Sequence, residues 1–105
     1  MPQIKELQEK IYKNKLNKGF NVTNVHLEIN LIMEELAEVF HAYHRKEDDL
    51  GEEIADVIIY CMGLASILNI DIEKELLNKI EKNDKRTYSR VNGVLKDDSK
   101  NNKNI

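Results

Sequence analysis

Residues that interrupt helices are scarce along this chain. Its one proline is the second residue, and only four glycines are spread over 105 residues. Proline and glycine disfavour a helix interior more strongly than any other residue. Long stretches are therefore free to be helical, provided that their apolar residues fall on one face.

Apolar residues recur at helical spacing, three or four positions apart, which predicts amphipathic helices. The pattern predicts a short helix over residues 4–11 and two long helices over 25–44 and 50–68. A fourth helix follows Asp71, which can provide its N-cap. The long helices carry apolar stripes, expected to face the core, that include Ile29, Leu36, Phe40, Tyr43, Ile54, Ile58 and Cys61.

Polar segments separate the predicted helices. Residues 13–24, rich in Asn and Lys, are interpreted as a loop, with Thr23 or Asn24 as the next N-cap. No segment alternates between apolar and polar residues over a useful length, so no strand is predicted. We expect an all-α helical bundle of one domain over residues 1–95, followed by a polar, flexible tail over 96–105. The two long central helices should pack antiparallel, because the turn between them is short.

Charge and cysteine content restrict the function. The net charge of −3 supplies no overall basic field for nucleic acid, and no run of 18 apolar residues could span a membrane. The single cysteine, Cys61, cannot form an intrachain disulfide and fits a reducing cytoplasm. We therefore expect a cytoplasmic protein that binds neither nucleic acid nor membrane. Because so short a chain builds only a modest core, a homo-oligomer is expected.

Each long helix carries one acidic cluster: Glu34-Glu35-Leu36-Ala37-Glu38 and Glu52-Glu53-Ile54-Ala55-Asp56. The common interpretation of such a run is a solvated helix face. At about 100° per residue, however, Glu35 and Glu38 lie on the same flank of their apolar stripe as Glu53 and Asp56 do on theirs. The two pairs also lie at similar distances from the turn. Antiparallel packing should therefore bring all four carboxylates together at the border of the core.

Carboxylates this close repel one another unless a cation lies between them. Ligands that are all oxygen suit Mg²⁺ first and Mn²⁺ second, and carboxylate-bound Mg²⁺ usually also binds phosphate oxygens. The fourth helix offers Lys79, Asn83 and Arg86 on one face, where they could close over phosphates. The alternative for Lys79 is an ordinary lysine at a helix end, with its ammonium in solvent.

Glu34-Glu35-x-x-Glu38, Glu53-x-x-Asp56 and Lys79-x-x-x-Asn83-x-x-Arg86 occur in this order. In these motifs the chain resembles the MazG-like nucleoside triphosphate pyrophosphohydrolases over roughly residues 20–88. This all-α superfamily also includes dimeric dUTPases, dCTP pyrophosphatases and phosphoribosyl-ATP pyrophosphohydrolases. The resemblance implies Mg²⁺-dependent hydrolysis between the α- and β-phosphates of a nucleoside triphosphate, giving a monophosphate and pyrophosphate.

The resemblance also implies residue roles. The metal ligands would be Glu35, Glu38, Glu53 and Asp56, and Glu38 or Glu53 could orient the attacking water. The residues in contact with phosphate or sugar would be Lys79, Asn83 and Arg86. Phe20 would pack on the base, although it could equally be an ordinary core or hinge residue. The family forms dimers or tetramers with sites completed across the interface, so a homodimer or tetramer is expected.

Three alternatives stay open. Glu38-x-x-His41 is one unit of a di-iron bundle, but such sites need the unit twice and the second cluster has no histidine. The chain could also be a non-catalytic helical module that binds nucleotides or a partner. It could finally be a related pyrophosphohydrolase that acts on another phosphorylated substrate, such as phosphoribosyl-ATP.

Overall fold

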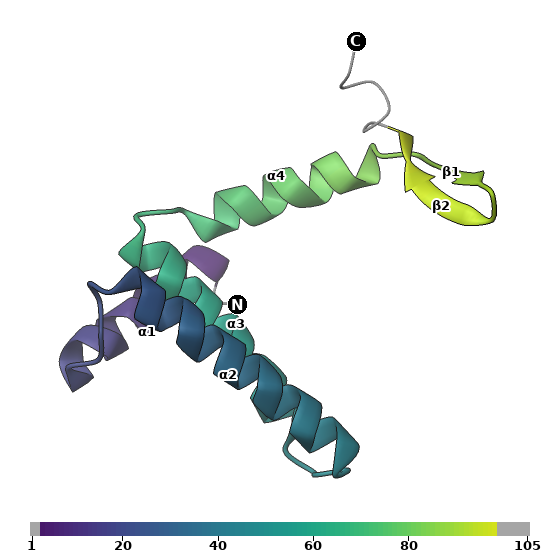
Figure 1. Ribbon diagram of the computed structural model, residues 1–105. Coiled ribbons are helices and arrows are strands. Elements are labelled where there is room, and N and C mark those ends of the chain that lie inside the picture. Colours follow the sequence, from purple (N-terminus) through teal and green to yellow (C-terminus); the bar gives the residue numbers. More distant parts are fainter. Residues whose placement is uncertain (1–2, 99–105) are drawn as a thin grey trace. The chain divides into compact units, whose positions relative to one another are not determined.

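The computed structural model describes residues 3–98 of the chain (Figure 1). Four helices are followed by two short strands, so the predicted all-α class is confirmed in a mostly helical chain with one added hairpin. The chain divides into two compact units, Met1–Glu73 and Lys74–Ile105. The elements are α1 (Ile4–Lys18), α2 (Val25–His44), α3 (Leu50–Ile67), α4 (Ile72–Asp84), β1 (Tyr88–Val91) and β2 (Val94–Asp97).

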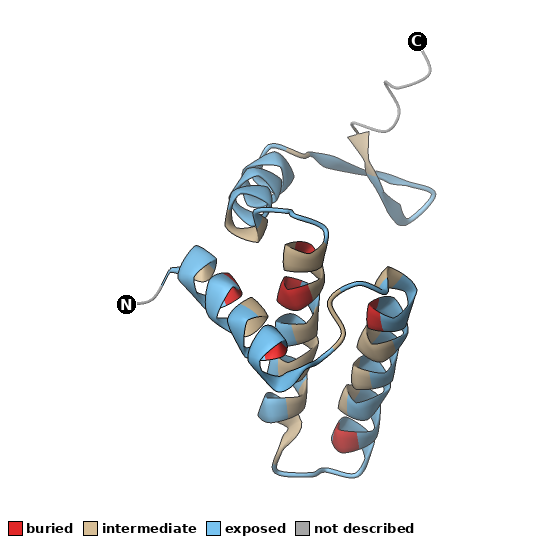
Figure 2. Ribbon diagram, turned by 90° about the vertical axis from the view of Figure 1, so that its left-hand side faces the viewer, coloured by how far each residue is buried: buried red, intermediate tan, exposed pale blue. Residues whose placement is uncertain are grey.

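The first unit is built around the predicted pair of long helices. Helices α2 and α3 run antiparallel and pack along their lengths, and α1 packs on α3 (Figure 2). The predicted N-cap of α2 is confirmed at Asn24, whose side chain accepts a hydrogen bond from the Leu27 N–H at 3.0 Å. The turn that reverses the chain into α3 contains Lys46 with a φ of 55°, a left-handed conformation.

Helix α1 is longer than predicted, so the loop expected over residues 13–24 is wrong for residues 13–18. The helix ends at Gly19, whose φ of 72° lies in the left-handed region that favours glycine. The Phe20 N–H then donates to the Lys15 carbonyl at 2.9 Å. A pattern of apolar residues misses this last part of α1 because the residue that it buries, Lys15, is charged.

Gln8 attaches α1 to the end of α3. Its Nε2 donates to Ser66 Oγ at 3.1 Å and to the Ile70 carbonyl at 2.8 Å. Its Oε1 accepts from the Ile72 N–H at 3.2 Å. One buried amide thus satisfies three polar groups at the end of α3 and in the turn that follows it.

The second unit contains a β-hairpin that the sequence analysis did not predict. Strand β1 pairs antiparallel with β2, from Tyr88 opposite Asp97 to Val91 opposite Val94. The turn between them is Asn92-Gly93, and both residues have positive φ, 53° and 80°. This is the turn chemistry that a two-residue hairpin prefers. The prediction of no strands was wrong here because each strand has only four residues.

The hairpin also contains the start of the segment expected to be a flexible tail. Lys96 and Asp97 lie in β2. The rest of that segment beyond residue 98 lies outside the described residues. The single domain expected over 1–95 stays a prediction.

Little of the described chain is fully buried. The buried apolar residues are Ala42, Met62 and Ala65, and the buried polar residues are Gln8, Lys15 and Glu28. Seven of the side chains predicted to face the core are instead exposed: Ile29, Leu36, Phe40, Tyr43, Ile54, Ile58 and Cys61. None of the described helices is by itself long and apolar enough to span a membrane. The helices α3 and α4, taken together as a bent pair, meet the length and composition criteria for a span.

Candidate functional site

Three of the four predicted acidic residues meet where α2 and α3 face each other. Glu35 comes from α2, and Glu53 and Asp56 come from α3, one turn apart. Each offers a carboxylate oxygen, and these three oxygens lie within 4.8 Å of one another. All three residues are half-buried. We call Glu35, Glu53 and Asp56 the carboxylate cluster.

Glu38, the fourth predicted ligand, lies outside this cluster. It is exposed, one helical turn after Glu35 on α2. The negative charge of Glu38 nevertheless acts on the cluster, because it helps to raise the pKa of both Glu35 and Glu53. Glu38 is therefore close to the cluster without being one of its three converging groups.

The carboxylate cluster is electrostatically unfavourable by itself. Loss of hydration raises the pKa of Glu35 above 4.5, and the charges of Asp56, Glu38 and Glu34 raise it further. Loss of hydration also raises the pKa of Glu53, followed by repulsion from Asp49 and Asp56. A cation between these groups would relieve the repulsion. An all-oxygen donor set of this kind fits a hard divalent ion such as Mg²⁺ or Mn²⁺.

A fourth carboxylate borders the cluster at the start of α3. Asp49 lies one turn before Glu53, and its Oδ1 is buried with no hydrogen-bond partner among the described residues. A buried carboxylate oxygen without a donor is costly. This oxygen adds to the excess of acceptors over donors at the cluster, and the excess again suits a cation.

The predicted phosphate-binding residues belong to the second unit. Lys79 and Asn83 are exposed on α4, and Arg86 follows its end. Arg86 Nε lies 3.4 Å from Asp97 Oδ2 of strand β2, an ion pair without hydrogen-bond geometry. This pairing was not predictable without the hairpin, because the strands bring together residues eleven positions apart.

A cavity of about 590 Å³ opens among α1, α2, α3 and the segment that joins the first two helices. The described residues that line it are Lys10, Ile11, Asn14, Lys15, Phe20, Asn21, Leu27, Glu28, Leu31, Ile59 and Tyr60. Phe20, the predicted base-packing residue, is among them and is half-exposed. The walls are thus mostly apolar with a few polar groups, which is typical of a small-molecule site.

The cavity adjoins the carboxylate cluster. Leu31 lies one turn before Glu35 on α2, and Tyr60 lies one turn after Asp56 on α3. One turn of helix is about 5.4 Å. Burial raises the pKa of Tyr60, and the charges of Glu35, Glu28 and Asp56 raise it further. Tyr60 therefore lies between the cluster and the polar groups of the cavity.

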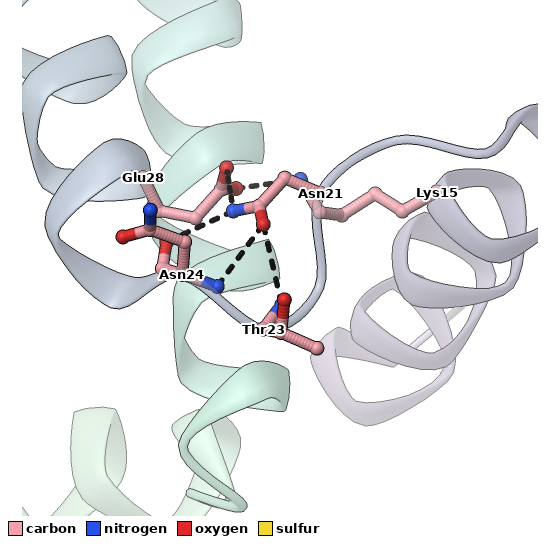
Figure 3. Close-up of polar contacts among 5 residues, drawn as sticks. All are labelled: Lys15, Asn21, Thr23, Asn24 and Glu28. Atoms are coloured by element: carbon pink, nitrogen blue, oxygen red, sulfur yellow. Dashed lines mark hydrogen bonds and ion pairs between the residues drawn. The ribbon is translucent and has the colours of Figure 1, made fainter.

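Buried Lys15 and Glu28 belong to a polar network (Figure 3), and together with Asn21 they line part of this cavity. Lys15 Nζ of α1 donates to Glu28 Oε1 of α2 at 2.6 Å, and Asn21 Nδ2 donates to Glu28 Oε2 at 3.1 Å. Asn21 Oδ1 accepts from the backbone N–H groups of Thr23 and Asn24. Sequence reasoning missed this network. The available signal was that Lys15 continues the row of Gln8 and Ile11 at helical spacing.

The di-iron alternative gains no support from the described residues. His41 is exposed, and its ring contacts that of Phe40 with 5.7 Å between centroids. Between residues 3 and 98, the one group of His, Cys, Asp and Glu that could hold an ion is the carboxylate cluster, which contains no histidine.

Comparison with known proteins identifies the family. The chain matches the MazG-like family over residues 24–97, from the N-cap of α2 to the last residue of β2. The matched stretch contains the whole carboxylate cluster and covers more than half of the chain. The chain therefore belongs to the MazG-like family, which includes nucleoside triphosphate pyrophosphohydrolases. No curated protein and no solved structure matches it.

Proposed function

We propose that this protein is a Mg²⁺-dependent pyrophosphohydrolase that cleaves a (deoxy)nucleoside triphosphate between its α- and β-phosphates. The products would be a nucleoside monophosphate and pyrophosphate. The observation that carries this proposal is the convergence of Glu35, Glu53 and Asp56 in a chain of the MazG-like family.

The carboxylate cluster would hold the ion, with Glu38 as a further ligand and with Mn²⁺ as a possible substitute. When bound, the ion would lower the pKa of a bound water and offset charge on the phosphates. Glu53 or Glu38 would orient the attacking water and accept its proton.

The remaining predicted residues would bind the rest of the substrate. Lys79, Asn83 and Arg86 carry the donors that phosphate or sugar oxygens require. Phe20 would pack against the base, since it lines the cavity next to the carboxylate cluster. A triphosphate bound at the cluster would direct its base into this cavity.

We further propose that the protein acts in the cytoplasm as a homodimer or tetramer. Large apolar side chains on α2 and α3 are more than half exposed, including Leu36, Phe40 and Ile58. Their contact with water is costly, and burial against a second copy would remove it. A lone thiol such as Cys61 stays reduced in the cytoplasm.

The test is pyrophosphate release from a panel of canonical and modified NTPs and dNTPs, with Mg²⁺ and with EDTA. We expect metal-dependent release with the monophosphate as co-product, and the ranking would give the base and sugar preference. Mg²⁺ binding without release from any nucleotide would favour another phosphorylated substrate. A folded chain that neither releases pyrophosphate nor binds Mg²⁺ would be a non-catalytic helical module.

A further inference from the structure

The buried ion pair in the cavity needs an explanation beyond stability. The side chains of Lys15 and Glu28 are 10% and 1% exposed. Removing two charges from water is costly, and well-packed apolar residues often stabilise a fold as well as a buried ion pair does. Three elements are nevertheless arranged around this pair: α1 supplies the ammonium, α2 the carboxylate, and Asn21 the second donor to it.

The path of Lys15 shows how closely the surrounding chain fits it. Its aliphatic part crosses α3 at Gly63, where a Cβ atom would lie 3.2 Å from Lys15 Cδ. Its Nζ lies 5.8 Å from the centroid of the Tyr60 ring. The ammonium is therefore held between Glu28 and an aromatic face, at a wall of the cavity.

The Lys15 ammonium can donate further hydrogen bonds. A lysine can donate three hydrogen bonds, and within residues 3–98 Lys15 makes one, to Glu28. Glu28 and Asn21 have fixed partners that hold the ammonium in place. Lys15 therefore offers a buried, charged donor to whatever enters the cavity.

The surroundings select the kind of acceptor. For an anionic group, repulsion by the Glu28 carboxylate, 2.6 Å from the ammonium, would offset much of the attraction to Lys15. A neutral acceptor on a flat ring meets no such repulsion and would also contact the apolar walls at Phe20 and Ile59. Every nucleobase presents such an acceptor at its edge, either a keto oxygen or a ring nitrogen.

We propose that Lys15 is the base-reading residue of the site: its Nζ donates a hydrogen bond to a keto oxygen or ring nitrogen of the substrate's nucleobase. Glu28 and Asn21 are positioning residues that hold the ammonium toward the cavity. This inference rests on the proposed function. Binding of the phosphates at the carboxylate cluster, one helical turn from the cavity, would direct the nucleobase into the cavity.

The test separates base from phosphate binding. Calorimetric titration with Mg²⁺ and α,β-methylene analogues of the four dNTPs measures binding of the whole nucleotide, and inorganic tripolyphosphate measures the phosphate part alone. Lys15→Met should weaken binding of the best analogue by about ten- to hundredfold, the size of a charge-assisted hydrogen bond. It should leave tripolyphosphate binding unchanged. Lys13→Met removes the same charge from an exposed position of α1 and should change neither affinity.

Further variants address folding and positioning. Lys15→Met combined with Glu28→Leu removes both charges, so the variant should stay folded by circular dichroism and show the same loss of analogue affinity. Glu28→Gln keeps the ammonium but loosens its position. It should raise KM for the nucleotide while kcat stays within about twofold, as expected for a group that acts on binding alone.

Each other outcome overturns the inference. Unchanged analogue binding by Lys15→Met would show that Lys15 does not contact the base. Equal weakening of analogue and tripolyphosphate would place its effect on the phosphates. A wild-type chain that binds tripolyphosphate but no nucleotide would remove the base contact while leaving the metal site. If the wild type binds neither, the proposed function fails as well.

Discussion

At the scale of single residues, the proposed chemistry depends on the carboxylate cluster. Carboxylate oxygens of Glu35, Glu53 and Asp56 lie within 4.8 Å of one another, and the charges that shift the pKa of Glu35 and Glu53 are all acidic within residues 3–98. Such an arrangement is unfavourable for folding and favourable for binding a cation. The cluster therefore differs from exposed acids such as Glu47, which forms an ion pair with Arg45 at 3.7 Å.

Removing one charge from this cluster should affect turnover more than folding. Glu53→Gln should reduce pyrophosphate release by about 10²- to 10⁴-fold, the range for loss of a general base. We expect the same direction for Glu38→Gln, with the helical content unchanged by circular dichroism. Glu47→Gln serves as the control and should keep wild-type turnover. Wild-type turnover in Glu38→Gln would remove Glu38 from the site.

The raised pKa values of Glu35 and Glu53 predict how stability depends on pH. In the folded chain both carboxyls bind protons more tightly than in the unfolded chain, where the pKa is about 4.5. Their contribution to the stability of the metal-free protein is therefore fully present below pH 4.5. It is lost as pH rises through the raised folded pKa values.

Mg²⁺ should reverse this loss, because it binds the deprotonated cluster of the folded state. We expect the rise in Tm on adding Mg²⁺ to be absent below pH 4.5 and to grow as pH rises through the raised pKa values. Scanning calorimetry over a pH series, with Mg²⁺ and with EDTA, measures it. The variant Glu35→Gln/Glu53→Gln should show no such rise at any pH. An equal Mg²⁺ effect in that variant would contradict a site at the cluster.

At the scale of helices and strands, sequence and structure agree where apolar spacing decides the fold. The helical spacing of apolar residues predicts α2 and α3. A rotation of about 100° per residue and a short turn between these helices then predict that Glu35, Glu53 and Asp56 meet. The end of α1 and its contact with Glu28 could not be predicted this way, because the buried residue is Lys15. The hairpin was missed because four-residue strands give little alternation, although Asn92-Gly93 is a strong turn signal.

Two glycines of α3 offer a matched test of the contact between α1 and α3. A Cβ at Gly63 would lie 3.2 Å from Lys15 Cδ, whereas a Cβ at Gly51 would meet nothing within 4 Å. Lys15 cannot easily move away, because Glu28 holds its other end at 2.6 Å. Gly63→Ala should therefore lower the free energy of unfolding by about 1 kcal/mol or more despite the better helix propensity of alanine. Gly51→Ala should raise it by up to about 1 kcal/mol.

A double-mutant cycle identifies the cause of the Gly63 effect. Lys15→Ala removes the Cδ atom that the new methyl group would approach. In that background Gly63→Ala should become stabilising, by up to about 1 kcal/mol, because only helix propensity remains. Urea unfolding of the wild type and the three variants measures the coupling. The same cost of Gly63→Ala in both backgrounds would show that Lys15 is not the obstacle.

At the scale of the whole molecule, the exposed apolar surface is the feature that one copy of the chain leaves unexplained. The stripes of α2 and α3 have the spacing of a core, yet Leu36, Phe40 and Tyr43 are 59%, 60% and 66% exposed. Burial of three apolar residues, the number found within residues 3–98, contributes little through the hydrophobic effect. A second copy that covers these stripes would supply the missing core, which a specific interface of roughly 1,600 Å² would allow.

Assembly should therefore depend on the stripe and not on charge in general. We expect the wild type to sediment as a dimer or tetramer, and Phe40→Asp to shift it toward the monomer because a buried, unpaired carboxylate is costly. Asn17→Asp adds the same charge at an exposed position of α1 and should leave the sedimentation coefficient unchanged. If sites are completed across the interface, turnover per chain should fall with dilution in step with dissociation. A wild-type chain that sediments as a monomer at assay concentration, and turns over its substrate there, would contradict this assembly.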